Sequence, residues 1–122
     1  MTVRDLNKLY YLNKLIERDT QRLAELEARL QPGGMRLSGT PRSPSPRNLI
    51  EELVPQIIEI RNRVLRERED YIRERAAIEE YIRSVDDYHI RLILSCRFVD
   101  LMSWRRIALL LGGGNKIGRA HV

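Results

Sequence analysis

The pattern of apolar residues predicts a long amphipathic helix over residues 3–30. Its apolar side chains recur at alternating steps of three and four: Leu9, Leu12, Ile16, Leu23, Leu26 and Leu30. This spacing lines them along one side of a helix and is typical of a helix that packs against another. Asp19 occupies the one polar position in the stripe. Because a lone helix cannot bury its own stripe, this one requires a partner.

Residues 48–85 carry a second stripe in one heptad register. Its apolar members are Ile50, Leu53, Ile57, Ile60, Val64, Tyr71, Ile78, Tyr81 and Val85, and its polar positions hold Glu67 and Glu74. Asn48 has the side chain of a helix N-cap. Pro55 either kinks this helix or begins the main helix after a short first piece. We favour a kink, because the register continues unbroken through Pro55.

Two such helices joined by a linker pack most simply as an antiparallel coiled-coil hairpin. Residues 1–31 form the first helix of this hairpin, residues 48–85 the second, and the Gly-, Pro- and Ser-rich residues 32–47 a flexible linker. Pairing Leu30 with Ile50 then places Asp19 near Arg61. We therefore expect an Asp19–Arg61 contact that fixes the register.

In this register the second helix extends beyond the first. Its extra length, about Tyr71 to Arg83, is expected to pack on the C-terminal helices or on a second copy of the chain. Asp86 or Asp87 is expected to cap a further helix, because an acidic side chain is favourable at a helix N-terminus. That helix has an apolar face and is expected to end near Asp100.

The segment after Asp100 has the spacing of the first half of a helix-turn-helix. Ser103 is expected to cap a helix from Trp104 to Leu111. Ala108 provides a small residue where a second helix would cross, and Gly112, four residues later, allows a tight turn. The apolar residues expected to hold the crossing are Trp104, Ile107 and Leu111. A generic amphipathic helix ended by glycine has the same spacing, so the pattern alone leaves both interpretations open.

The residues from Ile90 to Ala108 resemble the sigma-70 region 4-like fold. In that fold a helix with the pattern R-x-I-L-x-x-R-F leads through L-x-S-W into x-x-I-A-x-x-L-G, and residues 91–98, 101–104 and 105–112 follow this order. From about Leu6 to Asn115, the chain is similar in layout to phage and prophage regulators related to the ArpU and RinA late transcriptional activators. The resemblance implies an all-α, double-stranded-DNA-binding regulator of phage genes, acting in the bacterial cytoplasm near the host RNA polymerase.

In such proteins a recognition helix follows the turn and reads the major groove. Here we expect residues 86–116 to form only a partial helix-turn-helix without that helix. Arg105, Arg106 and Lys116 are then the candidates for phosphate contacts, which position a protein on DNA without reading its sequence. Residues 117–122 resemble the translation of a sequencing-adapter oligonucleotide, so we expect them to be foreign. DNA sequence beyond the codon for Asn115 tests this expectation.

The remaining chemistry is sparse. The net charge is +5, and its excess falls in the linker and the C-terminal part, which suits an anionic partner. Cys96, the only cysteine, is expected to be a buried thiol. His89 and Cys96 form no metal cluster, so we expect no metal, no cofactor, no catalytic residue and no enzyme activity. No apolar run is long enough to span a membrane.

A second function remains open, that of a coiled-coil adaptor that binds a protein partner and no DNA. The exposure of Trp104 distinguishes the two: burial in the crossing favours DNA binding, whereas exposure on an apolar patch favours the adaptor. The unpaired end of the long helix and the two-fold habit of helix-turn-helix proteins also indicate a homodimer.

Overall fold

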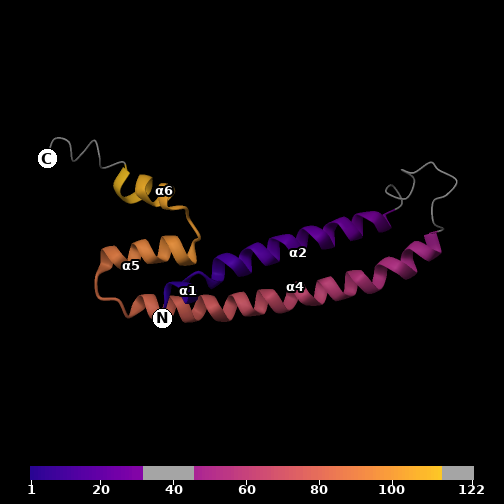
Figure 1. Cartoon of the computed structure of the whole chain (residues 1–122), viewed down its shortest axis with the longest axis horizontal. Coiled ribbons are helices and arrows are strands. Elements are labelled where there is room, and N and C mark those ends of the chain that lie inside the picture. The colour runs from indigo at the N-terminus through magenta and orange to yellow at the C-terminus, as the bar shows by residue number, and fades with distance from the viewer. Residues whose placement is uncertain (32–45, 114–122) are drawn as a thin grey trace. The chain divides into compact units, whose positions relative to one another are not determined.

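The structure is a computed structural model that describes residues 1–31 and 46–113, and these residues are all-helical, as the sequence predicts (Figure 1). The α-helices are α1 (Val3–Leu6), α2 (Lys8–Leu30), α4 (Pro46–Arg83), α5 (Tyr88–Leu94) and α6 (Trp104–Ile107). Two π-helical segments follow α5 and α6, at Ser95–Val99 and Ala108–Gly113. The predicted linker and the predicted foreign tail lie outside the described residues, apart from the last two linker positions.

The first predicted helix is interrupted near its start. Thr2 and Asp5 form a reciprocal capping box around α1, and the hydrogen bonds from Thr2 lower the pKa of Asp5. Asn7 is the C-cap of α1, and α2 begins at Lys8. The prediction of one helix over residues 3–30 is therefore wrong at Asn7, which ends α1 and separates it from α2.

The second helix begins earlier than predicted. Pro46 is the first residue of α4, so Asn48 lies inside the helix and is not its N-cap. Proline suits this first position, because the N–H it lacks would have no partner within the helix. The helix also continues through Pro55, which excludes a separate short piece, and it ends at Arg83, before Val85.

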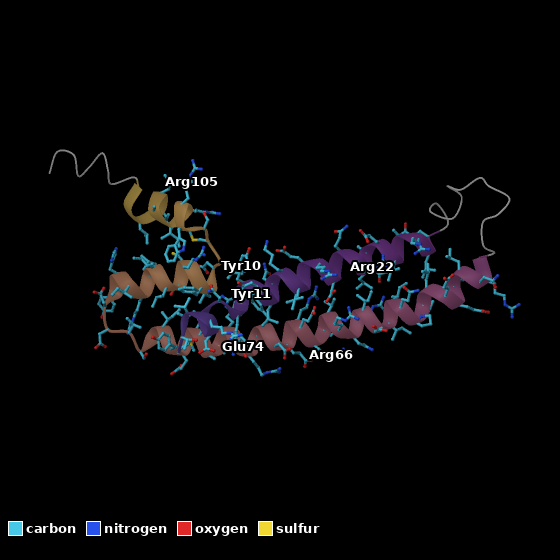
Figure 2. All side chains as sticks on the ribbon, in the orientation of Figure 1. Tyr10, Tyr11, Arg22, Arg66, Glu74 and Arg105 are labelled. Carbon is cyan, nitrogen blue, oxygen red and sulfur yellow. The ribbon has the colours of Figure 1, made fainter. Side chains whose placement is uncertain are left out.

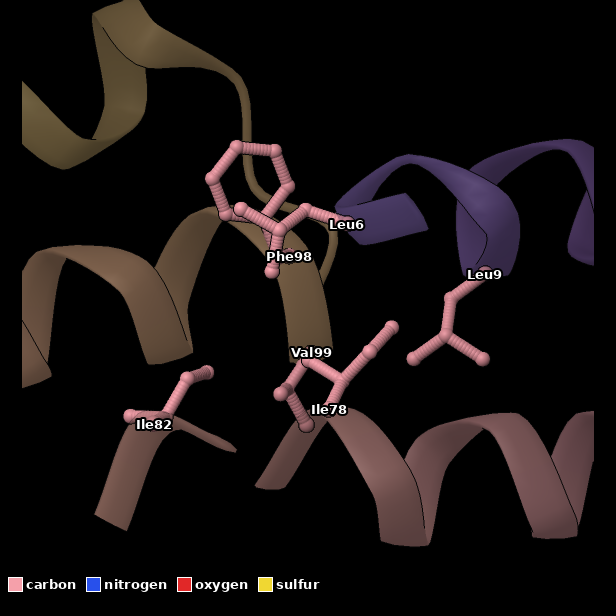
Figure 3. Close-up of a cluster of buried hydrophobic side chains, with 6 residues drawn as sticks. All are labelled: Leu6, Leu9, Ile78, Ile82, Phe98 and Val99. Carbon is pink, nitrogen blue, oxygen red and sulfur yellow. The ribbon is translucent and has the colours of Figure 1, made fainter. Parts of the chain in front are cut away.

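The chain divides into two compact units, each with its own buried core. Unit 1 contains Met1–Leu12 and the described residues from Tyr71 onward, and unit 2 contains Asn13–Asp70. The core of unit 1 gathers side chains from the start of the chain, the end of α4 and the first π-helical segment (Figure 3): Leu6, Leu9, Ile78, Ile82, Phe98 and Val99. The end of α4 thus packs on the C-terminal helices, which was one of the two expected outcomes.

In unit 2 the two helices lie side by side and run in opposite directions (Figure 1). The buried residues of unit 2 are Leu26, Leu49, Leu53, Ile57, Ile60 and Val64. The predicted register is wrong here: Leu49 is buried, whereas Ile50 is 49% exposed. Asp19 accordingly faces Arg63, and Arg61 instead pairs with Glu27 at 2.7 Å. The stripe follows the 3.6-residue period of an α-helix at this end, so it drifts from a strict heptad.

Short polar contacts connect α4 to α5. The side chain of Asp87 accepts hydrogen bonds from the backbone N–H groups of His89 and Ile90, so Asp87 is the residue that caps α5. Arg91 donates to the carbonyl oxygens of Arg83 and Val85. The contact with Arg83 satisfies a carbonyl that the end of α4 leaves without a helical partner.

Candidate nucleic-acid interface

Residues 100–103, within the segment that carries the resemblance, form a turn between the first π-helical segment and α6. The N–H of Asp100 bonds to the carbonyl of Ser95, and the N–H of Met102 bonds to the carbonyl of Cys96, both at 2.9 Å. Between them Leu101 has φ 58°, in the left-handed region that a leucine rarely adopts. Its side chain packs against the unit 1 core, which offsets the cost of that conformation. Cys96 is buried beneath this turn, as predicted.

Arg97 connects the two sides of this turn. Its Nη1 donates to the carbonyl oxygen of Met102 at 3.0 Å, and its guanidinium carbon lies 4.7 Å from the centre of the Trp104 ring. Phe98 meets the same ring edge-on, with centroids 6.5 Å apart. The guanidinium therefore bridges a backbone carbonyl and an aromatic face, an arrangement that its planar shape suits.

Ser103 begins α6 as predicted. Its hydroxyl oxygen accepts a hydrogen bond from the N–H of Arg106 at 3.1 Å. Ile107 is buried, and Ala108 is exposed. Because Ala108 is both small and exposed, another helix has room to approach the chain at this position.

The outer side of α6 carries the predicted phosphate-binding cations. The side chains of Arg105 and Arg106 are exposed, and Figure 2 shows Arg105 pointing away from α5. Lys116, the third candidate, lies outside the described residues. The two arginines form a basic surface at one end of unit 1.

Of the three apolar residues predicted to hold the helix crossing, only Ile107 is buried. Trp104 is 53% exposed and Leu111 is half-buried. Gly112 has no left-handed φ, and a Cβ added there would meet no atom within 4 Å. Its predicted role as the turn residue stays a prediction, because the residues after Gly113 lie outside the described ranges.

A hollow in unit 1 borders this turn and was missed by sequence reasoning. Its volume is about 440 Å³, and its lining is Leu6, Asn7, Tyr10, Tyr11, Arg97, Phe98, Leu101 and Ser103. Tyr10 and Tyr11, labelled in Figure 2, meet edge to face with centroids 5.4 Å apart. Both stand off the apolar stripe, and an adjacent off-stripe pair of aromatics is the sequence signal that marks this surface.

A metal site and a membrane-spanning helix find no support in the part of the chain that the structure describes. His89 is exposed on α5, and no group of three or more His, Cys, Asp or Glu side chains among those residues is arranged to hold a metal ion. None of the described helices is both long enough and apolar enough to cross a membrane.

Comparison with known proteins adds no relative: no family model, no curated protein and no solved structure matches the chain. Inferences about function therefore rest on the turn, α6 and the residues around them.

Proposed function

We propose that this chain is part of a phage or prophage transcriptional regulator that binds double-stranded DNA in the bacterial cytoplasm. In this proposal an antiparallel coiled-coil hairpin formed by α2 and α4 carries a partial helix-turn-helix in residues 86–116. The hairpin is a spacer and the C-terminal part contacts DNA. The proposed protein partners are host RNA polymerase, which the resemblance implies, and a second copy of the chain, which the two-fold habit of helix-turn-helix proteins indicates.

One observation carries the proposal: three residues that the sigma-70 region 4-like pattern specifies, Arg97, Phe98 and Trp104, contact one another beside the turn before α6. Arg97 bonds to the carbonyl of Met102 and stacks on Trp104, and Ser103 caps the helix. This agreement between pattern and contacts supports the resemblance without depending on relatives.

The proposed contacts to DNA are electrostatic. Arg105 and Arg106 lie in the first turn of α6 with exposed side chains, where they can reach phosphate oxygens. Contacts of this kind release counterions, so the affinity that they supply falls steeply with salt. The family pattern places a base-reading helix after Gly112, and the contacts proposed here do not depend on that helix.

Binding to a duplex of about 30 base pairs tests the proposal. Trp104 is the only tryptophan, so its emission reports binding near α6, and labelled-DNA anisotropy measures the affinity. At about 50 mM salt we expect weak binding that falls severalfold when salt is doubled. Replacing both Arg105 and Arg106 by Ala is expected to reduce the affinity at least about tenfold.

The matched control replaces Arg29 and Arg68 by Ala, because both are exposed arginines outside the C-terminal segment. This variant has the same net charge as the test variant and is expected to bind like the unmodified chain. Equal losses in the two variants, or no binding at low salt, would contradict the proposal.

A second candidate, a helical adaptor that binds a protein partner, is favoured by one specific observation. Trp104, Leu109 and Leu110 are 53%, 64% and 63% exposed on α6 and the segment after it. Exposed apolar residues that form a contiguous patch are typical of protein-binding surfaces. This candidate would be favoured if the chain left the anisotropy of the labelled DNA unchanged and the DNA left the emission of Trp104 unchanged.

A further inference from the structure

The hollow in unit 1 that borders the turn before α6 is lined mainly by hydrogen-bond donors. Five of the eight described residues around it have side chains that can donate: Asn7, Tyr10, Tyr11, Arg97 and Ser103. The other three are apolar, and no aspartate or glutamate is among the described residues that line it. Such a lining suits an anion, because it offers several donors and one permanent positive charge without a carboxylate to repel the ligand.

Three of these donors still have a proton to give. Within the described part of the chain, the side chains of Asn7 and Tyr11 make no hydrogen bond. The hydroxyl oxygen of Ser103 accepts a hydrogen bond from the N–H of Arg106, so its own proton remains to be donated. Tyr11 is 64% exposed, and water that meets such groups can be replaced by a ligand that has several acceptor oxygens.

Arg97 supplies the positive charge of the hollow. Its Nη1 already donates to the carbonyl of Met102, and its guanidinium covers one face of Trp104. A guanidinium has five N–H groups in one plane, so others remain for a ligand while these contacts hold the side chain in place. Because the side chain is already ordered, little conformational entropy is lost when it binds.

A second hollow, in unit 2, shows why the absence of acids matters. Its volume is about 460 Å³, and its lining includes Arg18, Arg22 and Arg63. Asp19 and Glu25 line it as well, and they lie 3.7 Å from Arg63 and Arg22, respectively. An anion there would meet two carboxylates and cations that are already paired. The hollow in unit 1 has fewer arginines but is the more favourable of the two for an anion.

We propose that the hollow in unit 1 receives a phosphate group of the DNA backbone, with Asn7, Tyr11 and Ser103 donating to its oxygens beside Arg97. The proposal rests on DNA binding by this chain and extends the contact surface from α6 to the start of the chain. The volume of about 440 Å³ lies within the range of about 300–1000 Å³ that is usual for ligand sites. A phosphate held here would fix how the chain lies on the duplex without reading its sequence.

Tyr11→Phe tests the hydroxyl and keeps the ring that packs on Tyr10. We expect the affinity for the duplex of about 30 base pairs, at about 50 mM salt, to fall about threefold to tenfold, as for the loss of one hydrogen bond. An apolar contact with another ligand would survive this change. Tyr88→Phe is the matched control: it removes the same hydroxyl from an 80% exposed tyrosine of unit 1 that does not line the hollow. It should bind like the unmodified chain.

Asn7→Asp tests the charge preference of the hollow. It replaces an amide donor by a carboxylate of nearly the same shape, and we expect the affinity to fall at least about fivefold because the carboxylate repels the phosphate. Asn62→Asp, at an exposed position on α4 in unit 2, changes the net charge equally but lies outside the hollow. It is expected to bind nearly as tightly as the unmodified chain.

Nitrogen-15 NMR supplies a readout that needs no substitution. We expect the side-chain amide signal of Asn7 and the Nε–H signal of Arg97 to shift as the duplex is added, with the affinity that anisotropy measures. Unshifted signals during binding would overturn the phosphate site, as would Tyr11→Phe and Asn7→Asp variants that bind like their controls. The proposed function would stand in those cases if the loss on replacing Arg105 and Arg106 remained. An unmodified chain that binds no DNA at low salt would overturn both proposals.

Discussion

At the scale of single residues, Arg97 is the side chain whose loss should be felt most widely. It holds the carbonyl of Met102 and covers one face of Trp104, and both contacts stabilise the turn before α6. We predict that Arg97→Ala lowers the free energy of unfolding by roughly 1–3 kcal/mol, since a part-buried hydrogen bond and a cation–π contact are both lost. Urea unfolding, followed through the emission of Trp104, measures this change.

Two further variants show whether the geometry of the guanidinium matters. Arg97→Lys keeps the charge without the planar fork, and we expect it to recover only part of the stability. Arg105→Ala removes an exposed arginine on the next helix and is expected to change stability by less than about 0.5 kcal/mol. An Arg97→Ala variant as stable as the unmodified chain would show that the turn does not depend on this side chain.

At the scale of the helix, N-caps stabilise the helices that they begin, and the sequence already indicates where they lie. Asp87 accepts two backbone N–H groups at the start of α5, at 2.8 and 3.1 Å. We predict that Asp87→Ala lowers the free energy of unfolding by about 1 kcal/mol, which is typical for loss of an N-cap. Asp86→Ala provides the control, because its side chain is exposed and does not cap the helix. Denaturant unfolding that shows equal losses for the two variants would contradict this assignment.

The same scale shows which parts of the fold are readable from sequence. Ser103 and an acid at 86 or 87 were predicted as caps because a cap depends on a few neighbouring residues. The break at Asn7 was missed, because Leu6 and Leu9 on either side of it keep the three-residue spacing of a continuous helix. The register of α2 on α4 was also wrong, because Leu49 and Ile50 both fit the stripe. Only the packing of the whole seam chooses between them.

The candidate site shows the same difference between local features, which the sequence predicts, and long-range contacts, which it does not. Ser103 and Ile107 behave as their local pattern predicts, whereas the hollow beside Tyr10 and Tyr11 joins residues from opposite ends of the chain. Arg97 belonged to the recognised pattern, but its role emerges only when Met102 and Trp104 are seen around it. A single sequence does not predict which residues from distant segments come into contact.

At the scale of the whole molecule, two separate cores replace the single seam that the sequence suggests. Each apolar stripe keeps one register along its helix through its few polar positions, yet the contacts fall into two clusters. One lies around Leu9 and Ile78 and the other around Leu26 and Leu53. A stripe records which side of a helix is buried but not where one cluster ends and the next begins. The division into units therefore became visible only in the structure.

Two cores imply that damage to one should be felt first within its own unit. Leu26 is fully buried in unit 2, so we predict that Leu26→Ala lowers its stability by roughly 2–5 kcal/mol. Amide hydrogen exchange should accelerate in residues 20–28 and 53–66 and change far less in residues 88–99, which belong to unit 1. Leu15→Ala makes the same chemical change in unit 2 at a side chain that is 45% exposed, and it should alter exchange only slightly. If Leu26→Ala accelerated exchange equally in unit 2 and in residues 88–99, the two cores would have to unfold together. A loss of stability within unit 2 reaches the amides of unit 1 only when both cores open in one cooperative step.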